Sequence, residues 1–404
     1  MASSLAVVSG GLCAYWALTA GVGRVLRSRV TDARQSNRFV PVVRVGAGDA
    51  GEYVEFPVRS FAAHPGVLGV TTPRGSRLVL GPPETHFELV RRPVLAGDSA
   101  SLRRERRGRL SGYLGETPSD HGLAYQDVEL EGQAMWQVPG REPGQASVWA
   151  IHVHGLGSRR SQTLRSVETF ANLGIPSLVP TYRTSLDGQT APPRSHLGLT
   201  EWQQVARAQE YAVAAGAEKI IFVGWSLGAS IVLQTIQRVP CPAVRGALLV
   251  SPALDWRAIT LAALNEARVP RGLARWAMSG FNLARPSGDP HVPWAELPGT
   301  SMTTDPQVPV LLFHGAADAS VPIRLSRDLA ERQPRVRLVE FPGAHHTLEW
   351  NSDPALWDRE IRAWCAALDL PIGTPADTVN DLERHTSWQQ PKAQQREISG
   401  PLRP

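Results

Sequence analysis

The stretch that decides the fold is KIIFVGWSLGASIVLQ, residues 219–234. Residues 220–223 are apolar and mostly β-branched, as expected of a buried strand, and residues 229–234 are typical of a helix. Between them stands G-W-S-L-G, which matches the G-x-S-x-G pattern of a nucleophile on a tight turn between strand and helix. Gly224 and Gly228 lack a Cβ, so strand and helix can approach closely while Ser226 takes a strained backbone conformation. We therefore predict Ser226 as a nucleophile in an α/β fold.

On both sides of this segment, apolar strand-like runs alternate with helical segments. The strand-like runs are 147–153, 177–180, 219–223, 246–250, 308–313 and 336–341, and the helical segments are 162–173, 200–215, 229–237, 323–333 and 354–368. This alternation favours a mostly parallel sheet with helices on both faces, which we assign to residues 121–370. The connection from Leu254 to Leu297 is too long for a simple loop and predicts a helical lid insertion at about residues 254–300.

The chain before this domain has a different character. Residues 31–120 carry short apolar runs at 53–58, 67–72, 77–80 and 86–90, separated by Gly, Pro and charged residues, which indicates a β-rich extension. The basic cluster at 103–109 lacks alternating aromatic residues, so the net charge of +5 does not point to a nucleic-acid partner. Residues 371–404 are polar and contain proline, and we expect this tail to be disordered.

The N-terminus is apolar. Residues 2–23 carry no charge, and Arg24, Arg27 and Arg29 follow. A stretch of this length can cross a bilayer, so residues 1–30 are interpreted as a single-pass membrane anchor, with the catalytic domain on the cytoplasmic side by the positive-inside rule. A cleaved signal sequence and a soluble N-terminal helix stay open as alternatives.

Two further residues complete a candidate catalytic triad. Asp318 follows the strand-like run 308–313, and His346 follows the run 336–341. Parallel strands place functional groups beyond their carboxyl ends, and the chain order Ser226, Asp318, His346 is the order typical of one class of hydrolase. His346 would take the proton from the Ser226 hydroxyl, and Asp318 would hold the imidazole. His345 is the alternative base.

A glycine-rich turn after the strand-like run 147–153 is the candidate oxyanion loop. We expect the N–H groups of Leu227 and Leu156 to stabilise the oxyanion, with Gly155 as a weaker candidate. Tyr182 and Trp225 are candidate substrate-binding residues, although a structural role for the turn after residue 180 is also open.

No metal or other cofactor is expected. His152 and His154 form only an H-x-H pair, and a metal site needs three or four ligands. The three cysteines, Cys13, Cys241 and Cys365, do not form a disulfide framework.

These motifs resemble the α/β-hydrolase superfamily, in particular its bacterial serine aminopeptidase and lysophospholipase-like branch. The resemblance covers roughly residues 120–370 and is carried by residues 151–155, 179–183, 197–202, 224–228, 314–318 and 343–347. It implies hydrolysis of an ester, thioester or amide without a metal. In such sequences the histidine directly before the threonine is the base, which favours His346 over His345.

The leading hypothesis is a serine hydrolase that cleaves a carboxylic ester of a small acyl or lipid-like substrate through an acyl-enzyme. Its expected partners are that substrate and, through the N-terminal segment, a membrane. No obligate protein partner is implied. The alternatives are a serine peptidase of the same fold acting on short peptides and a catalytically inactive hydrolase fold used for binding, because one fold hosts many functions.

Overall fold

The computed structural model describes residues 2–32, 38–141, 147–187, 193–282, 292, 297 and 307–372. These residues divide into two compact units. The first contains residues 2–32 and 115–372, and the second contains residues 38–114. The polar tail predicted at residues 371–404 lies outside the described residues from position 373 onward.

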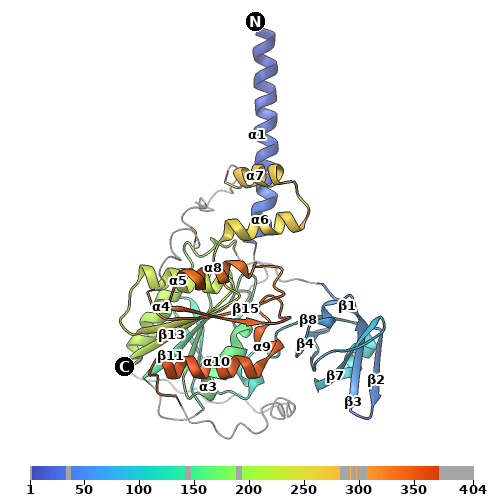
Figure 1. Ribbon diagram of the computed structural model, residues 1–404, viewed down its shortest axis with the longest axis vertical. Helices are drawn as coiled ribbons and strands as arrows, with labels where there is room; N and C mark the ends of the chain where they lie inside the picture. The colour runs from blue at the N-terminus through green and yellow to red at the C-terminus, as the bar shows by residue number, and fades with distance from the viewer. Residues whose placement is uncertain are drawn as a thin grey trace. The chain divides into compact units, whose positions relative to one another are not determined.

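The first unit is built on one sheet, whose strands run in the order β16-β15-β14-β13-β11-β12-β10-β9 (Figure 1). The strands from β11 to β16 pair in parallel, whereas β10 pairs antiparallel with both β9 and β12. The bounds are β9 Gln126–Leu130, β10 Gln133–Val138, β11 Val148–Val153, β12 Ser177–Pro180, β13 Lys219–Trp225, β14 Val244–Val250, β15 Val310–Gly315 and β16 Val336–Phe341. The predicted mostly parallel sheet is confirmed.

Helices cover both faces of this sheet. Figure 1 shows α4, α5 and α8 on one side of the sheet and α3 and α10 on the other. Their bounds are α3 Leu164–Asn172, α4 Trp202–Ala214, α5 Leu227–Arg238, α8 Arg324–Arg332 and α10 Pro354–Ala367, and the short α9 (Glu349–Ser352) precedes α10. The predicted α/β-hydrolase fold is confirmed, and each helix begins and ends within a few residues of its expected position.

Aromatic packing secures the layer on the α10 side. Trp357 of α10 is fully buried and lies against Trp225, Phe313 and Phe341, with ring centroids 5.4, 4.9 and 6.4 Å away. Its indole N–H donates to the Thr169 hydroxyl on α3 at 3.2 Å. Aromatic side chains bury the largest apolar areas in a core, so this cluster holds β13, β15 and β16 against α10 just below the carboxyl ends of the strands.

Two helices follow β14 where a lid was predicted. They are α6 (Trp256–Glu266) and α7 (Arg271–Gly280). Their inward residues Ile259, Ala277 and Met278 belong to the main apolar core. The rest of the predicted lid, residues 283–300 apart from Val292 and Leu297, lies outside the described residues.

The N-terminal segment is one helix, α1 (Ala2–Thr31), with its C-terminal half packed on α7 (Figure 1). Thr19 and Arg27 are each only 2% exposed, and the Trp276 indole donates to the Thr19 hydroxyl at 2.8 Å. No helix in the part of the chain that the structure describes has both the length and the apolar character needed to cross a bilayer. The predicted membrane-associated localisation through a single-pass anchor is therefore wrong. Serine, threonine and glycine residues lower the hydropathy of the stretch, and α1 continues through three of the arginines that follow it.

The second unit is an antiparallel sheet in the order β1-β8-β4-β5-β7-β3-β2, with β6 paired to β7. Its strands are β1 Val40–Pro41, β2 Arg44–Gly48, β3 Gly51–Pro57, β4 Leu68–Thr71, β5 Arg77–Leu80, β6 Glu84–His86, β7 Leu89–Gly97 and β8 Arg107–Ser111. The strand expected at residues 86–90 is instead a hairpin turn at Phe87, whose φ is +51°. The basic cluster lies on α2 (Ser99–Glu105), on β8 and on the residue between them.

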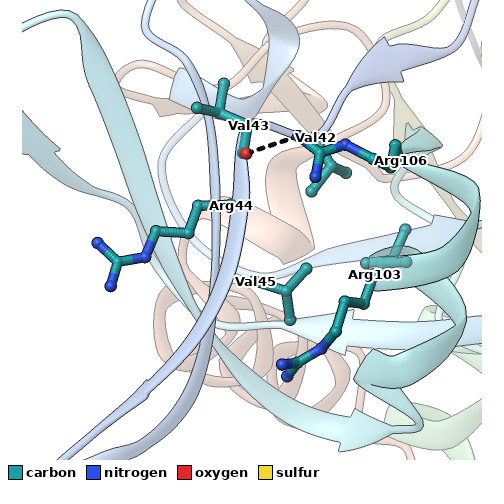
Figure 2. Close-up of a pocket in the computed structure, with 7 residues that line it drawn as sticks. Val42, Val43, Arg44, Val45, Arg103 and Arg106 are labelled. Carbon is teal, nitrogen blue, oxygen red and sulfur yellow. Dashed lines mark hydrogen bonds between the residues drawn. The ribbon is translucent and has the colours of Figure 1, made fainter.

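A surface hollow of about 140 Å³ lies beside β2 and α2 in this unit (Figure 2). Val42, Val45 and Leu102 form its apolar part, and the Arg106 guanidinium donates to the Val43 carbonyl at 3.2 Å. This arginine follows the C-terminus of α2, where a cation suits the helix dipole. The hollow holds none of the residues predicted for catalysis.

Candidate active site

Ser226 lies on the turn between β13 and α5. Its φ is +52° and its ψ is −112°, outside the regions that non-glycine residues ordinarily occupy. The turn is held from both sides, because the Ser226 N–H donates to the Val250 carbonyl at 2.9 Å and its carbonyl accepts from the N–H groups of Ala229 and Ala253. These three hydrogen bonds stabilise the strained backbone conformation, which directs the hydroxyl beyond the carboxyl ends of the strands.

The two glycines of the motif are required by close approach. A Cβ on Gly224 would lie 2.6 Å from the Ala229 Cα, and one on Gly228 would lie 2.1 Å from the Val153 carbonyl oxygen. Strand β13, helix α5 and the end of β11 therefore meet at distances that no other residue type permits.

The structure brings the three predicted residues together in series. His346 Nε2 lies 2.9 Å from the Ser226 hydroxyl oxygen, and His346 Nδ1 lies 2.7 Å from Asp318 Oδ2. The histidine follows β16 and the aspartate follows β15, so adjacent strands deliver the pair to one edge of the sheet. About a quarter of the His346 side chain is exposed, whereas the Asp318 carboxyl is fully buried. His345, the alternative base, is exposed to solvent.

The Asp318 carboxylate is held from several directions. Its Oδ1 accepts the N–H groups of Ser320 and Val321 at 2.8 Å each. Its Oδ2 faces His346, the Ser251 hydroxyl at 3.0 Å and His314 Nε2 at 3.3 Å. These donors fix the carboxylate in place.

The electrostatics match this geometry. Burial by itself raises the pKa of Asp318, but the His346 charge and the hydrogen bonds from His314, His346 and Val321 outweigh it and hold that pKa well below its usual range. Burial lowers the pKa of His346, and the Asp318 carboxylate more than reverses this effect, so the pKa of His346 is raised. An ionised aspartate thus faces an imidazole whose protonated form it stabilises.

The loop after β11 lies beside Ser226. A Cβ on Gly155 would stand 3.2 Å from the Ser226 Cβ, so the backbone here approaches the hydroxyl closely. The Gly155 N–H donates to Gln162 Oε1 at 2.7 Å. The Tyr182 hydroxyl lies 2.7 Å from the His154 carbonyl and 2.9 Å from the Gly155 carbonyl. Gln162 and Tyr182 together fix this loop.

Neither predicted substrate-binding residue faces open space. Trp225 is fully buried, stacked on Trp357 with the Arg165 guanidinium 4.5 Å from its ring. Tyr182 is only 2% exposed and stacks on His154 with 4.3 Å between ring centroids. This burial counts against direct substrate contact by either side chain, because Trp225 packs in the core and Tyr182 supports the loop after β11.

The H-x-H histidines each face partners other than a metal. His152 lies between the Ser166 and Ser177 hydroxyls at 2.9 and 3.0 Å, and burial lowers its pKa to about 3. His154 contacts the Gly155 carbonyl and the Ser185 hydroxyl, both at 2.9 Å. These neutral imidazoles brace the loop.

Three neighbours support the site: Gln162, Ser251 and Glu349. Each acts on the site through a neighbour rather than directly. Ser251 directly follows β14 and Glu349 follows His346 by three residues. The position of Ser251 and Glu349 at the carboxyl edge of the sheet is the sequence signal that points to them as neighbours of the site.

Residues 150–359 match the model of the alpha/beta hydrolase family. The chain belongs to this family. The coarse function that follows is that of a hydrolase. The match does not distinguish the serine aminopeptidase and lysophospholipase-like branch from other members. No curated protein matches the sequence.

Solved hydrolase structures are similar to part of the chain. A Pyrococcus furiosus esterase is 19% identical, with a TM-score of 0.47 over 63% of this chain and 94% of its own. An esterase from Rhodococcus sp. ECU1013 is 19% identical, with a TM-score of 0.40 over 61% of this chain and 99% of its own. A serine hydrolase from Cycloclasticus zankles is 15% identical, with a TM-score of 0.42 over 61% and 99%. Likeness at this level says nothing of substrate.

Proposed function

We propose that this hydrolase cleaves a carboxylic ester through an acyl-enzyme on Ser226. The observation that carries the proposal is the unbroken series from the Ser226 hydroxyl to His346 Nε2 at 2.9 Å and from His346 Nδ1 to Asp318 Oδ2 at 2.7 Å. Side chains 120 and 28 residues apart in sequence meet with the contacts that nucleophilic catalysis requires.

In this mechanism His346 accepts the Ser226 proton as the serine oxygen attacks the ester carbonyl. Asp318 stabilises the resulting imidazolium, and His346 then returns the proton to the departing alkoxide, which leaves as an alcohol. Water, deprotonated by the same imidazole, attacks the acyl-enzyme, releases the carboxylic acid and restores the serine hydroxyl.

The oxyanion of each tetrahedral intermediate is assigned to the N–H groups of Leu227 and Leu156. Leu227 is the first residue of α5, where the helix dipole favours negative charge. The Gly155 N–H already donates to Gln162, which supports Leu156 rather than Gly155 as the second donor. Such a donor contributes about 10²–10³-fold in rate.

The segment after β14 that carries α6 and α7 favours a substrate with an apolar acyl group. Ala253, whose N–H bonds to the Ser226 carbonyl, stands three residues before α6 begins. The inward side of α6 and α7 consists of apolar residues such as Ile259 and Met278. The segment after β14 thus begins beside the nucleophile and is rich in apolar residues, which supports a lipid-like or small acyl ester as the substrate.

A fluorophosphonate probe tests the proposal, because it labels only an activated serine. We expect the full chain to be labelled and Ser226→Ala to lose all labelling. Ser279→Ala, which alters an exposed serine of α7, is the matched control and should label like the unaltered chain. Full labelling of a folded Ser226→Ala variant would contradict the assignment. Turnover of p-nitrophenyl esters against aminoacyl-nitroanilides then separates esterase from peptidase.

A further inference from the structure

A buried acid beside the triad has no part in the mechanism above. Glu349 is the first residue of α9 and is fully buried. Its Oε1 contacts the Ser251 hydroxyl and accepts the Gly315 N–H at 3.1 Å. Its Oε2 has no hydrogen-bond partner among the described residues. A buried carboxylate without a cation or several donors is costly, so the protonation state of this side chain needs an explanation.

Ser251 stands between this acid and the triad. Its hydroxyl oxygen lies 3.0 Å from Asp318 Oδ2, touches Glu349 Oε1 and accepts the Thr347 N–H at 3.2 Å. A serine hydroxyl carries one hydrogen. If both carboxyl groups were ionised, the hydroxyl could donate to only one of them, and its lone pair would face the negative oxygen of the other.

A proton on one carboxyl group removes this conflict. The surroundings of the two groups decide which one carries it. Asp318 accepts the N–H groups of Ser320 and Val321 and also contacts His346, whereas Glu349 accepts the Gly315 N–H with Oε1 and its Oε2 has no hydrogen-bond partner among the described residues. We propose that Glu349 is a neutral carboxylic acid that donates to the Ser251 hydroxyl, which in turn donates to Asp318. Glu349 and Ser251 are thus positioning residues for the proposed reaction, and the inference rests on that function.

The charges around Glu349 agree with this assignment. Burial raises the pKa of Glu349, and the Asp318 charge adds to the rise, while the Ser251 hydrogen bond and His314 act against it. His346 stands beyond Asp318, and the Arg165 guanidinium of α3 donates to the Thr347 carbonyl and the Asn351 side chain of the same turn.

A neutral Glu349 matters for the base. An ionised Glu349 would raise the pKa of His346 further and keep the imidazole protonated to higher pH. A neutral acid instead orients Asp318 through Ser251 and adds no charge, so His346 becomes available as a base at lower pH.

The pH dependence of fluorophosphonate labelling separates the two protonation states. Glu349→Gln replaces one neutral side chain by another, so the midpoint at which labelling falls on the acid side should stay unchanged. If Glu349 is ionised, the same substitution removes a negative charge and moves the midpoint down by about one pH unit or more. Ser251→Ala should lower the limiting labelling rate about 10-fold without changing the half-saturating probe concentration, because Asp318 loses a donor.

Infrared spectroscopy detects the proton on the Glu349 carboxyl group directly and does not depend on catalysis. In full-length protein labelled with ¹³C at the glutamate carboxyl groups, the carbonyl stretch of a protonated acid should be present at neutral pH and absent from Glu349→Gln. If that variant does not fold, the Ser251→Ala spectrum takes its place, and the band should shift as its hydrogen-bond acceptor disappears. Absence of the band at neutral pH overturns the proposal. Absence of wild-type labelling overturns the proposed function instead, and the infrared result still decides the state of Glu349.

Discussion

At the scale of single residues, the site depends on how the imidazole of His346 is charged. Its pKa is raised above the ordinary 6.5, because the effect of Asp318 exceeds that of burial. The carboxylate of Asp318 stays ionised, since its pKa lies well below the usual range. The neutral imidazole is the form that can accept a proton, so in the proposed mechanism His346 sets the pH at which activity is lost.

We therefore predict that fluorophosphonate labelling is complete above the raised pKa of His346 and is lost as the pH falls through it, with a midpoint above 6.5. Labelling rates measured across the pH range give this midpoint. His345→Ala is the control, because that neighbouring imidazole is exposed and should not affect the profile. A midpoint below 6.5, or one that moves in His345→Ala, would count against the assignment of His346.

The sequence located the candidate catalytic side chains better than their supporting contacts. Ser226, Asp318 and His346 each follow a strand, and the ends of strands can be predicted from apolar runs bounded by glycine. The direction in which a side chain faces at such an end cannot be predicted in this way, so the sequence did not show that Trp225 and Tyr182 are buried. The link from Ser251 to Glu349 joins residues 98 apart, and only the folded sheet brings them together.

At the scale of elements, the strand–turn–helix unit around Ser226 illustrates why the sheet was predictable. Strands β13 and β14 are apolar on both faces, as expected where helices cover both sides of a parallel sheet. The β-rich unit was harder, because its short strands depend on turns such as that at Phe87, where a bulky residue adopts a left-handed conformation.

Gly228→Ala tests the packing of this unit. The added methyl group would lie 2.1 Å from the Val153 carbonyl oxygen, so α5 or β11 must shift. A shift of this order misplaces the Ser226 hydroxyl, and we expect labelling to fall by about 10²-fold or more. Gly272→Ala is the matched control, since a Cβ at that helical position meets nothing within 4 Å. Equal labelling of the two variants would show that close approach at Gly228 is not required.

At the scale of the whole molecule, the N-terminal helix has a role that hydropathy alone did not predict. One side of α1 carries Thr19, Gly23 and Arg27, and all three face protein rather than solvent. The Arg27 guanidinium lies 5.2 Å from the centre of the Phe281 ring. The Thr31 carbonyl accepts the Ser195 N–H at 2.8 Å, and Asp32 accepts from the Arg194 side chain at 2.9 Å. The C-terminal end of the stretch that was predicted to span a membrane thus packs on the segment following β14.

The tightest point of this packing gives a prediction about stability. A Cβ on Gly23 would lie 1.9 Å from the Gly280 carbonyl oxygen, whereas one on Gly21 would meet nothing within 4 Å. Gly23→Ala should therefore separate α1 from α7 and lower the free energy of unfolding by about 1–3 kcal/mol. Gly21→Ala should raise it by about 0.5–1 kcal/mol through helix propensity alone. Thermal unfolding followed by circular dichroism compares the two. Both variants add one methyl group to the same helix two residues apart. Equal midpoints would therefore mean that α1 does not pack on α7 in solution, and opposite shifts would show that it does.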